Sequence, residues 1–251
     1  MKKIMILLLA VIMTGFAFAA TAQDILAEVA SNYENLNDAK ATISLTKKDG
    51  SENLSSDFCI YVFKKDENTR YSIVRFLSPR EKKNITLLAK GQGETYMYMP
   101  ALRSVKKMQA ASENEKFADS DFTYGELSLL YKISAFAEKA TIYSQNDEEY
   151  GIEIRQENKA LAYSSMRIKI AKDKMLPEEV YFYDWENKPS KVIRITDYRE
   201  IEGKMVPWSI TATDYNTKGK TTISFREISL DMGMNEDFFT PKSISRSRLK
   251  Y

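Results

Sequence analysis

Turn residues divide the chain between residues 41 and 230 into short extended segments, and this punctuation constrains the fold more than any other feature. Lys48-Asp49-Gly50 and Glu202-Gly203 separate segments rich in β-branched and aromatic residues, a pattern typical of strands joined by tight turns. A tight turn favours antiparallel neighbours, because a parallel pair needs a long crossover. About ten to twelve strands in one chain predict a mainly β (α+β) fold with a large curved antiparallel sheet or an open barrel. Strands are expected near residues 41–47, 54–64, 70–77, 84–90, 94–99, 138–144, 150–157, 165–171, 178–183, 191–200, 204–215 and 220–230.

The two halves of the predicted sheet differ in hydrophobic pattern. Late strands alternate, as where Met166, Ile168 and Ile170 are interleaved with Arg167 and Lys169, and such strands have one face in water. Early strands do not alternate: the segment 58–63 is apolar or aromatic at every position. The early half of the sheet is therefore expected to be covered on both sides. Helices alone could provide that cover, or one face could meet an apolar ligand such as a lipid.

Two helices are predicted at the margins of this pattern. Residues 23–36 place Ile25, Leu26 and Val29 on one stripe at helical spacing. A second, shorter helix is expected near 123–130, capped by Asp121 or by Thr123, and Glu126 follows Thr123 by three residues, the spacing of a capping box. Each helix either packs on the sheet or covers the mouth of a cavity, and the same apolar stripe suits both arrangements.

Residues 1–22 have the pattern of a secretory signal peptide. Lys2 and Lys3 precede an apolar run, and Ala20-Thr21-Ala22 matches the small-residue cleavage pattern, so cleavage is expected after Ala22. The remaining residues, 23–251, are expected to form one domain in the periplasm. An uncleaved membrane anchor is the alternative, although the apolar run is short for a spanning helix.

Charge and cysteine content narrow the classes of function. Removing Lys2 and Lys3 leaves 37 − 2 = 35 basic residues against 35 acidic ones, so nothing favours a nucleic-acid partner. Cys59 is the only cysteine and lies in an apolar strand, which predicts a buried, inert thiol. The polar, basic end of the chain, 243–251, predicts a loosely held tail.

The sequence lacks the usual constellations of catalysis. It contains no histidine, which excludes Ser-His-Asp and Cys-His catalysis and histidine-containing metal sites. No nucleotide-binding glycine motif is present. The acidic runs 147–149 and 178–179 lie next to turns, where solvated charge is expected. No catalytic residue, metal site or cofactor is therefore predicted, and the chain is expected not to be an enzyme.

The segment 94–127 carries a resemblance to a known family. Its residues Tyr98, Pro100, Arg103, Phe117, Ser120, Asp121, Phe122 and Tyr124 resemble the aromatic–Leu-Pro, Arg and Gly-Ser-Asp-Phe signature of outer-membrane lipoprotein-sorting proteins. Those proteins are similar to the periplasmic lipoprotein carriers LolA and LolB. Two positions depart from the signature: Asp119 stands where the family has Gly, and Gly125 where it has an acidic residue, with Glu126 one place later. The resemblance implies an open half-barrel with lid helices on its concave side.

The resemblance also implies a carrier that shelters acyl chains during outer-membrane sorting. Its cargo would be a lipidated protein or a lipid, an inner-membrane transporter is a possible partner, and a monomer is expected. From the strand pattern alone, we predict that the acyl chain lies against six residues, Phe58, Ile60, Val62, Leu87, Met97 and Met99. Two alternatives stay open: an interaction module of an envelope transport system, and a lipid-modifying enzyme that works without histidine.

Overall fold

The computed structural model describes residues 20–249 except 35, 50–51, 67–68, 92, 110–111 and 160. Its centre is one antiparallel sheet in the order β6-β5-β4-β3-β2-β1-β13-β12-β11-β10-β9-β8-β7. The strands are β1 (Asp38–Asp49), β2 (Glu52–Lys64), β3 (Arg70–Ser78), β4 (Thr86–Ala89), β5 (Thr95–Met99), β6 (Ser104–Met108), β7 (Ala140–Gln145), β8 (Glu149–Arg155), β9 (Ser165–Ala171), β10 (Leu176–Tyr183), β11 (Pro189–Ile201), β12 (Lys204–Asp214) and β13 (Lys220–Leu230). The helices are α1 (Ala22–Glu34), α2 (Tyr124–Lys132) and α3 (Pro241–Ile244), with 3₁₀ turns η1 (Pro100–Leu102), η2 (Phe117–Asp119), η3 (Ile133–Lys139) and η4 (Glu236–Phe238).

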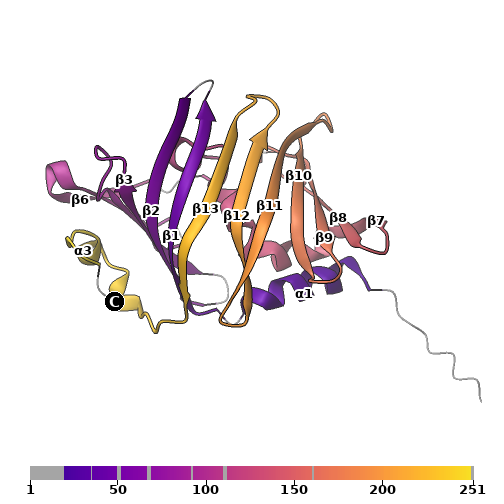
Figure 1. Ribbon diagram of the computed structural model, residues 1–251, viewed down its shortest axis with the longest axis horizontal. Helices are drawn as coiled ribbons and strands as arrows, with labels where there is room; N and C mark the ends of the chain where they lie inside the picture. Colours follow the sequence, from indigo (N-terminus) through magenta and orange to yellow (C-terminus); the bar gives the residue numbers. More distant parts are fainter. Residues whose placement is uncertain are drawn as a thin grey trace, which may run out of the picture.

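The sheet consists of two meanders joined along one seam. The early strands, β1–β6, and the late strands, β7–β13, each pair with their neighbours in sequence, and β1 pairs with β13 from Ala39↔Leu230 to Lys48↔Lys220. The sheet does not close into a barrel: β6 and β7 are its two edge strands and are not paired with each other. Figure 1 shows the resulting open half-barrel, and the predicted mainly β, antiparallel fold is confirmed.

Three helical segments cover one face of the sheet, which we call the inner face. Ile25, Leu26 and Val29 of α1 are buried with apolar side chains of the late strands, and α1 also contacts η3 and α2. In Figure 1, α1 lies at the lower ends of β12 to β9. Both predicted helices form, and their apolar side chains pack on this face. Helix α1 starts at Ala22, and α2 starts at Tyr124 after Thr123, one of the two predicted caps.

The C-terminal segment, residues 231–249, covers the outer face of the early strands. Phe238, Phe239 and Ile244 are buried in a second apolar cluster with Cys59, Tyr61, Tyr71, Ile73 and Leu88. This cluster explains why the early strands are apolar on both faces: one faces the helices and the other faces this segment. The prediction of a loosely held tail from 243 is wrong for its first residues, since Ser243 and Ile244 are buried. The buried thiol of Cys59 is confirmed.

Two buried charges hold the C-terminal segment in place. The Arg75 guanidinium donates hydrogen bonds to the carbonyl oxygens of Ile244 (3.0 Å), Arg246 (2.9 Å) and Ser247 (3.3 Å). The carboxylate of Asp38 accepts the backbone N–H groups of two residues just after β13, Met232 and Met234, at 2.8 and 2.9 Å. Hydrogen bonds to charged groups are stronger than neutral ones, so these contacts offset the burial of both ions.

Replacing Arg75 should release this segment from the sheet. Arg75→Met leaves three carbonyl oxygens without their donor, and we expect a loss of about 2–3 kcal/mol in the free energy of unfolding. Limited proteolysis should then cut after residue 231 faster than in the wild type. Arg80→Met, at an exposed position, is the matched control and should change neither the urea midpoint nor the cleavage rate.

Charged side chains and aromatic rings line the outer face of the late strands. Glu153 accepts hydrogen bonds from Arg155 (2.8 Å) and Arg167 (2.9 Å), and the Arg167 guanidinium lies 4.7 Å from the ring centre of Tyr183. Burial favours a raised pKa for Glu153, but the hydrogen bonds from Arg167 and Arg155 outweigh it and hold the pKa below its usual range.

This pairing predicts acid sensitivity. A carboxyl whose pKa is lower in the folded state stabilises the protein above its unfolded pKa, about 4.3 for Glu, and the contribution is lost as the pH falls through the lower folded value. Urea unfolding at a series of pH values should show the free energy of unfolding declining below about pH 4.3, less steeply in Glu153→Gln. Glu157→Gln, at an exposed position, should keep the wild-type slope; equal slopes for all three proteins would contradict the prediction.

One strand of the structure was not predicted from the sequence. The strands expected from the sequence include none between residues 99 and 138, but residues 104–108 form β6, paired with β5. β6 is an edge strand of the sheet. Lys106 and Lys107 point to opposite faces of it, and both are exposed to water. The alternation of apolar residues that identifies a half-buried strand is therefore absent.

Candidate functional site

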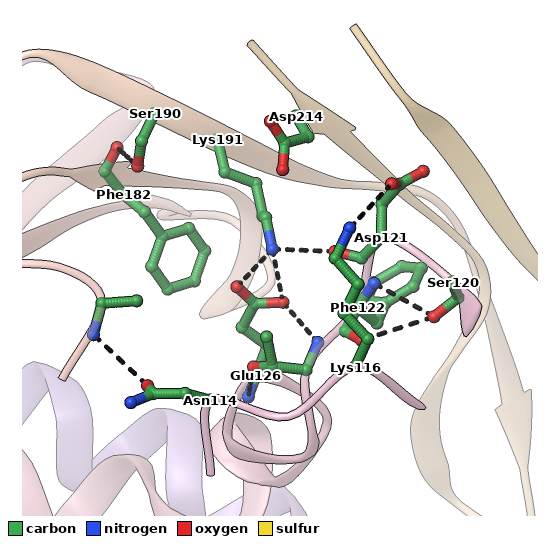
Figure 2. A network of polar contacts seen from close by, with 12 residues as sticks. Asn114, Lys116, Ser120, Asp121, Phe122, Glu126, Phe182, Ser190, Lys191 and Asp214 are labelled. Carbon is green, nitrogen blue, oxygen red and sulfur yellow. Dashed lines mark hydrogen bonds and ion pairs between the residues drawn. The ribbon is translucent and has the colours of Figure 1, made fainter. Parts of the chain in front are cut away.

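A buried polar network fixes the start of α2 to the inner face. The ammonium group of Lys191, on β11, lies 2.8 and 3.1 Å from the two carboxylate oxygens of Glu126 and donates to the carbonyl oxygen of Asp121 at 2.8 Å. Figure 2 shows these contacts converging on Lys191. Only 11% of the Lys191 side chain and 4% of the Glu126 side chain are exposed, so the pair is shielded from solvent screening.

The carboxylate of Asp121 extends the network to β13. Asp121 accepts a hydrogen bond from the hydroxyl of Thr221 at 2.7 Å, and this hydroxyl accepts the Asp121 N–H at 3.0 Å. A Cβ at Gly219 would lie 2.5 Å from Asp121 Oδ1, so the turn between β12 and β13 requires glycine there. We call Lys191, Glu126, Asp121 and Thr221 the inner clip, because they fasten the chain before α2 to two strands of the sheet.

The same glutamate also starts the helix. Glu126 accepts the Thr123 N–H at 2.8 Å, while the Thr123 hydroxyl accepts the Glu126 N–H at 3.2 Å. This is the predicted capping box, which satisfies two amide groups at the end of the helix. Glu126 therefore joins a local signal in the sequence to a distant partner on β11.

The second half of the family-like motif forms the short segment that the inner clip holds. Phe117, Ser120 and Phe122 are buried, with Phe117 packed edge-on against Tyr124 at 5.6 Å between ring centres. Asp119 has φ 61°, in the left-handed region that favours glycine, which gives a physical reason for the glycine that the related family has there. These motif residues serve the packing of α2 on the sheet.

The first half of the motif lies elsewhere. Tyr98 belongs to β5 and packs with the C-terminal cluster on the outer face, and Pro100 starts η1. Arg103 ends that turn with φ 46° and is exposed. The motif is therefore two structural units, one on each side of the sheet, and its residues do not converge on one point.

The six residues predicted to contact the acyl chain all lie on the inner face. Ile60 packs against the inner core, and the register aligns Ile60 with Val74, Val74 with Leu87, and Leu87 with Met97. Residues two apart on a strand share a face, which places Phe58, Val62 and Met99 with them. Phe58 is fully buried against Phe76 and Phe117, at 4.6 and 5.5 Å between ring centres, while the other five are half-buried.

The inner face is covered unevenly. On the late strands, Ile152, Ile168 and Ile170 have no exposed surface, because α1 and η3 lie over them. On the early strands Ile43, Phe58 and Phe76 are buried, but the apolar side chains farther from them on β2, β3, β4 and β5 are only half-buried. Leu127 of α2, Phe136 of η3 and Phe225 of β13 are also half-buried against the same core. We call the half-buried residues Ile60, Val62, Val74, Leu87, Met97 and Met99 the inner apolar patch.

Tyr163 lies close enough to Glu126 to feel its charge. Burial raises the pKa of Tyr163 to about 12, with Glu126 and Glu113 adding to the shift, so this phenol stays neutral. Within the part of the chain that the structure describes, no group of three or more His, Cys, Asp or Glu residues could hold a metal ion. None of the described helices has the length and apolar character of a membrane-spanning segment.

Sequence reasoning missed Lys191 and Thr221 as parts of the site. Both were assigned only to predicted strands, and a lysine within a strand ordinarily points to water. A weak signal existed in β11, where Lys191 shares its parity with the apolar Ile193 and Ile195 and therefore their face of the sheet.

A family model described as an uncharacterized-protein-like family matches residues 68–246, more than half of the sequence. The chain belongs to this family. No curated protein matches the sequence.

Three solved structures share the fold. An outer membrane lipoprotein-sorting protein domain from Vibrio parahaemolyticus aligns with a TM-score of 0.74 and 20% identity over 89% of this chain and 98% of that chain. A DUF1329 family protein from Desulfovibrio piger ATCC 29098 gives 0.76 and 17% over 89% and 97%. A LolA superfamily protein from Nitrosomonas europaea gives 0.66 and 17% over 88% and 98%. The predicted resemblance to lipoprotein-sorting and LolA-type proteins is confirmed for the fold.

Replacing Lys191 of the inner clip should destabilise the protein strongly, and a second substitution should restore most of the lost stability. Lys191→Met leaves the Glu126 carboxylate buried without its cation, and we expect a loss of about 3–5 kcal/mol in the free energy of unfolding. Adding Glu126→Gln, which keeps an acceptor for the capping box, should recover most of that loss. Chemical denaturation of the single and double variants measures both values.

An exposed lysine provides the control for that experiment. Lys188 pairs with Glu186 at 2.6 Å, but 71% of its side chain is exposed. Lys188→Met should therefore cost no more than about 1 kcal/mol. An equal effect for Lys188→Met and Lys191→Met would contradict the role assigned to the inner clip.

Proposed function

We propose that the protein is a periplasmic carrier that binds the acyl chains of a lipid or a lipidated protein against the inner apolar patch. The observation that carries this proposal is the inner apolar patch, a set of half-buried apolar side chains on four adjacent strands of the inner face. The fold shared with lipoprotein-sorting proteins supports it. In this proposal the cargo comes from the inner membrane and is delivered toward the outer membrane.

The energetic demand on such a carrier is large. Exposing an acyl chain to water costs about 0.8 kcal/mol per methylene, so a chain of about fourteen methylenes requires ~11 kcal/mol of compensating contact. The inner apolar patch supplies side chains of unequal shape from four adjacent strands. Met97 and Met99 suit a ligand that must also leave, because unbranched thioether side chains adapt to irregular surfaces at low cost.

The remaining features of the proposal follow from the sequence. The N-terminal segment directs export, the carrier acts as a monomer, and an inner-membrane transporter hands over the cargo. No cofactor, metal ion or catalytic residue takes part. An interaction module with the same fold is the rival, and it differs in one measurable respect: it needs no affinity for acyl chains.

A charge on the inner apolar patch should abolish binding. Met97→Glu places a carboxylate where the acyl chain would lie, and burying an unpaired charge in apolar surroundings costs several kcal/mol. We expect the variant to lose at least tenfold in affinity for a fluorescent fatty acid and for a lipidated peptide, measured by fluorescence titration. Near-ultraviolet circular dichroism should confirm that it stays folded.

The matched control adds the same charge to the same sheet at an exposed site. Asn53 lies on β2 opposite Lys48, and Asn53→Glu should bind both probes as the wild type does. Wild-type affinity in a folded Met97→Glu protein would show that the patch is not the site. If the wild type binds neither probe, the carrier proposal fails and the interaction module takes its place.

A further inference from the structure

We infer that the exported protein is cut between Ala19 and Ala20, so that the mature chain keeps Thr21 and Ala22. This inference rests on the export proposed above, and it differs from the cleavage after Ala22 expected from the sequence. Water adds across the peptide bond in the reaction of a signal peptidase: Ala19 leaves with a carboxylate, and Ala20 becomes the new N-terminal ammonium group.

The first observation is that Thr21 caps α1. Its hydroxyl accepts the Asp24 N–H at 3.2 Å, and the Asp24 carboxylate accepts the Thr21 N–H at 2.9 Å and the Thr21 hydroxyl at 2.7 Å. The Thr21 carbonyl oxygen accepts the Ile25 N–H at 3.1 Å, the first bond of the helix. The N–H and hydroxyl of Thr21 also lower the pKa of Asp24, so the cap includes a charge at the favourable end of the helix.

The second observation is that Ala22 belongs to the core. It is the first residue of α1, has 5% of its surface exposed and packs in the inner core with Ile25 and Leu26. Cleavage after Ala22 would remove this residue together with every hydrogen bond of the Thr21 cap. It would also leave the ammonium group of Gln23 in the first turn, next to the positive end of the helix dipole.

The third observation is a second small-residue pattern just upstream. Ala17-Phe18-Ala19 has alanine one and three residues before the inferred cut, as Ala20-Thr21-Ala22 has for the alternative. Ala20 is exposed, so a charged amino group at this residue remains in water. The sequence pattern permits both cuts, and the cap together with the buried Ala22 favours the upstream one.

Intact mass and N-terminal sequencing of the protein purified from the periplasmic fraction test the inference. The expected N-terminus is Ala20-Thr21-Ala22-Gln23. An N-terminus at Gln23 would overturn the inference and leave the proposed export intact. A chain that retains Met1 would overturn both.

Two adjacent substitutions form a matched pair. Ala19→Phe puts a large side chain directly before the inferred cut, and we expect precursor to accumulate or the N-terminus to move to Gln23. Ala20→Phe puts the same side chain three residues before the alternative cut, and we expect normal processing with Phe at position 20 as the first residue. An N-terminus at Gln23 in both the wild type and Ala19→Phe, or accumulated precursor in Ala20→Phe, would overturn the inference.

A stability measurement checks the physical reason independently of the processing enzyme. Chains that begin at Ala20 and at Gln23 can both be prepared by cutting a fusion protein with a site-specific protease. The chain from Ala20 should unfold at a higher urea concentration, and Thr21→Val should move its midpoint toward that of the shorter chain. Equal midpoints for the two chains would remove the structural basis of the inference.

Discussion

The pairing of β1 with β13 is the constraint on which the rest of the structure depends. It joins strands that begin at Asp38 and end at Leu230, and without it the two meanders would be separate sheets with four free edges. It also brings the end of β13 beside the start of β1, where the Asp38 carboxylate receives the amide groups of the following segment. The covering of the outer face therefore begins at the seam that unites the sheet.

The two faces of the early strands are covered by different kinds of structure. The outer face receives the C-terminal segment, which follows β13 directly and is fixed by Arg75. On the inner face, Phe117 of η2 packs on Phe58, while α1 and η3 lie mainly over the late strands. The C-terminal segment thus packs on the outer face of the early strands, while the residues of the inner apolar patch on the opposite face stay half-buried.

The inner clip decides how far the helical layer extends over the sheet. Lys191 and Thr221 come from two late strands and hold the chain at Asp121, just before α2 begins. A buried ion pair of this kind contributes specificity of position, since any shift of α2 would leave a charge without its partner. The inner clip therefore fixes the start of α2 to β11 and the preceding residue Asp121 to β13.

The sequence by itself determined the elements, and the tertiary structure decided their partners. Turn residues and local periodicity indicated the strands, α1 and the capping box at Thr123, because these signals depend on neighbours within a few residues. The two-sided apolarity of 58–63 correctly indicated cover on both faces but could not say that 231–249 provides half of it. Strand β6 was missed because an edge strand needs no apolar pattern. The role of Lys191 was missed because its partner Glu126 is distant in sequence. Contacts between residues so far apart leave no periodic signal, so only the folded sheet shows which apolar surface remains half-buried and which polar residues fasten α2 to the sheet.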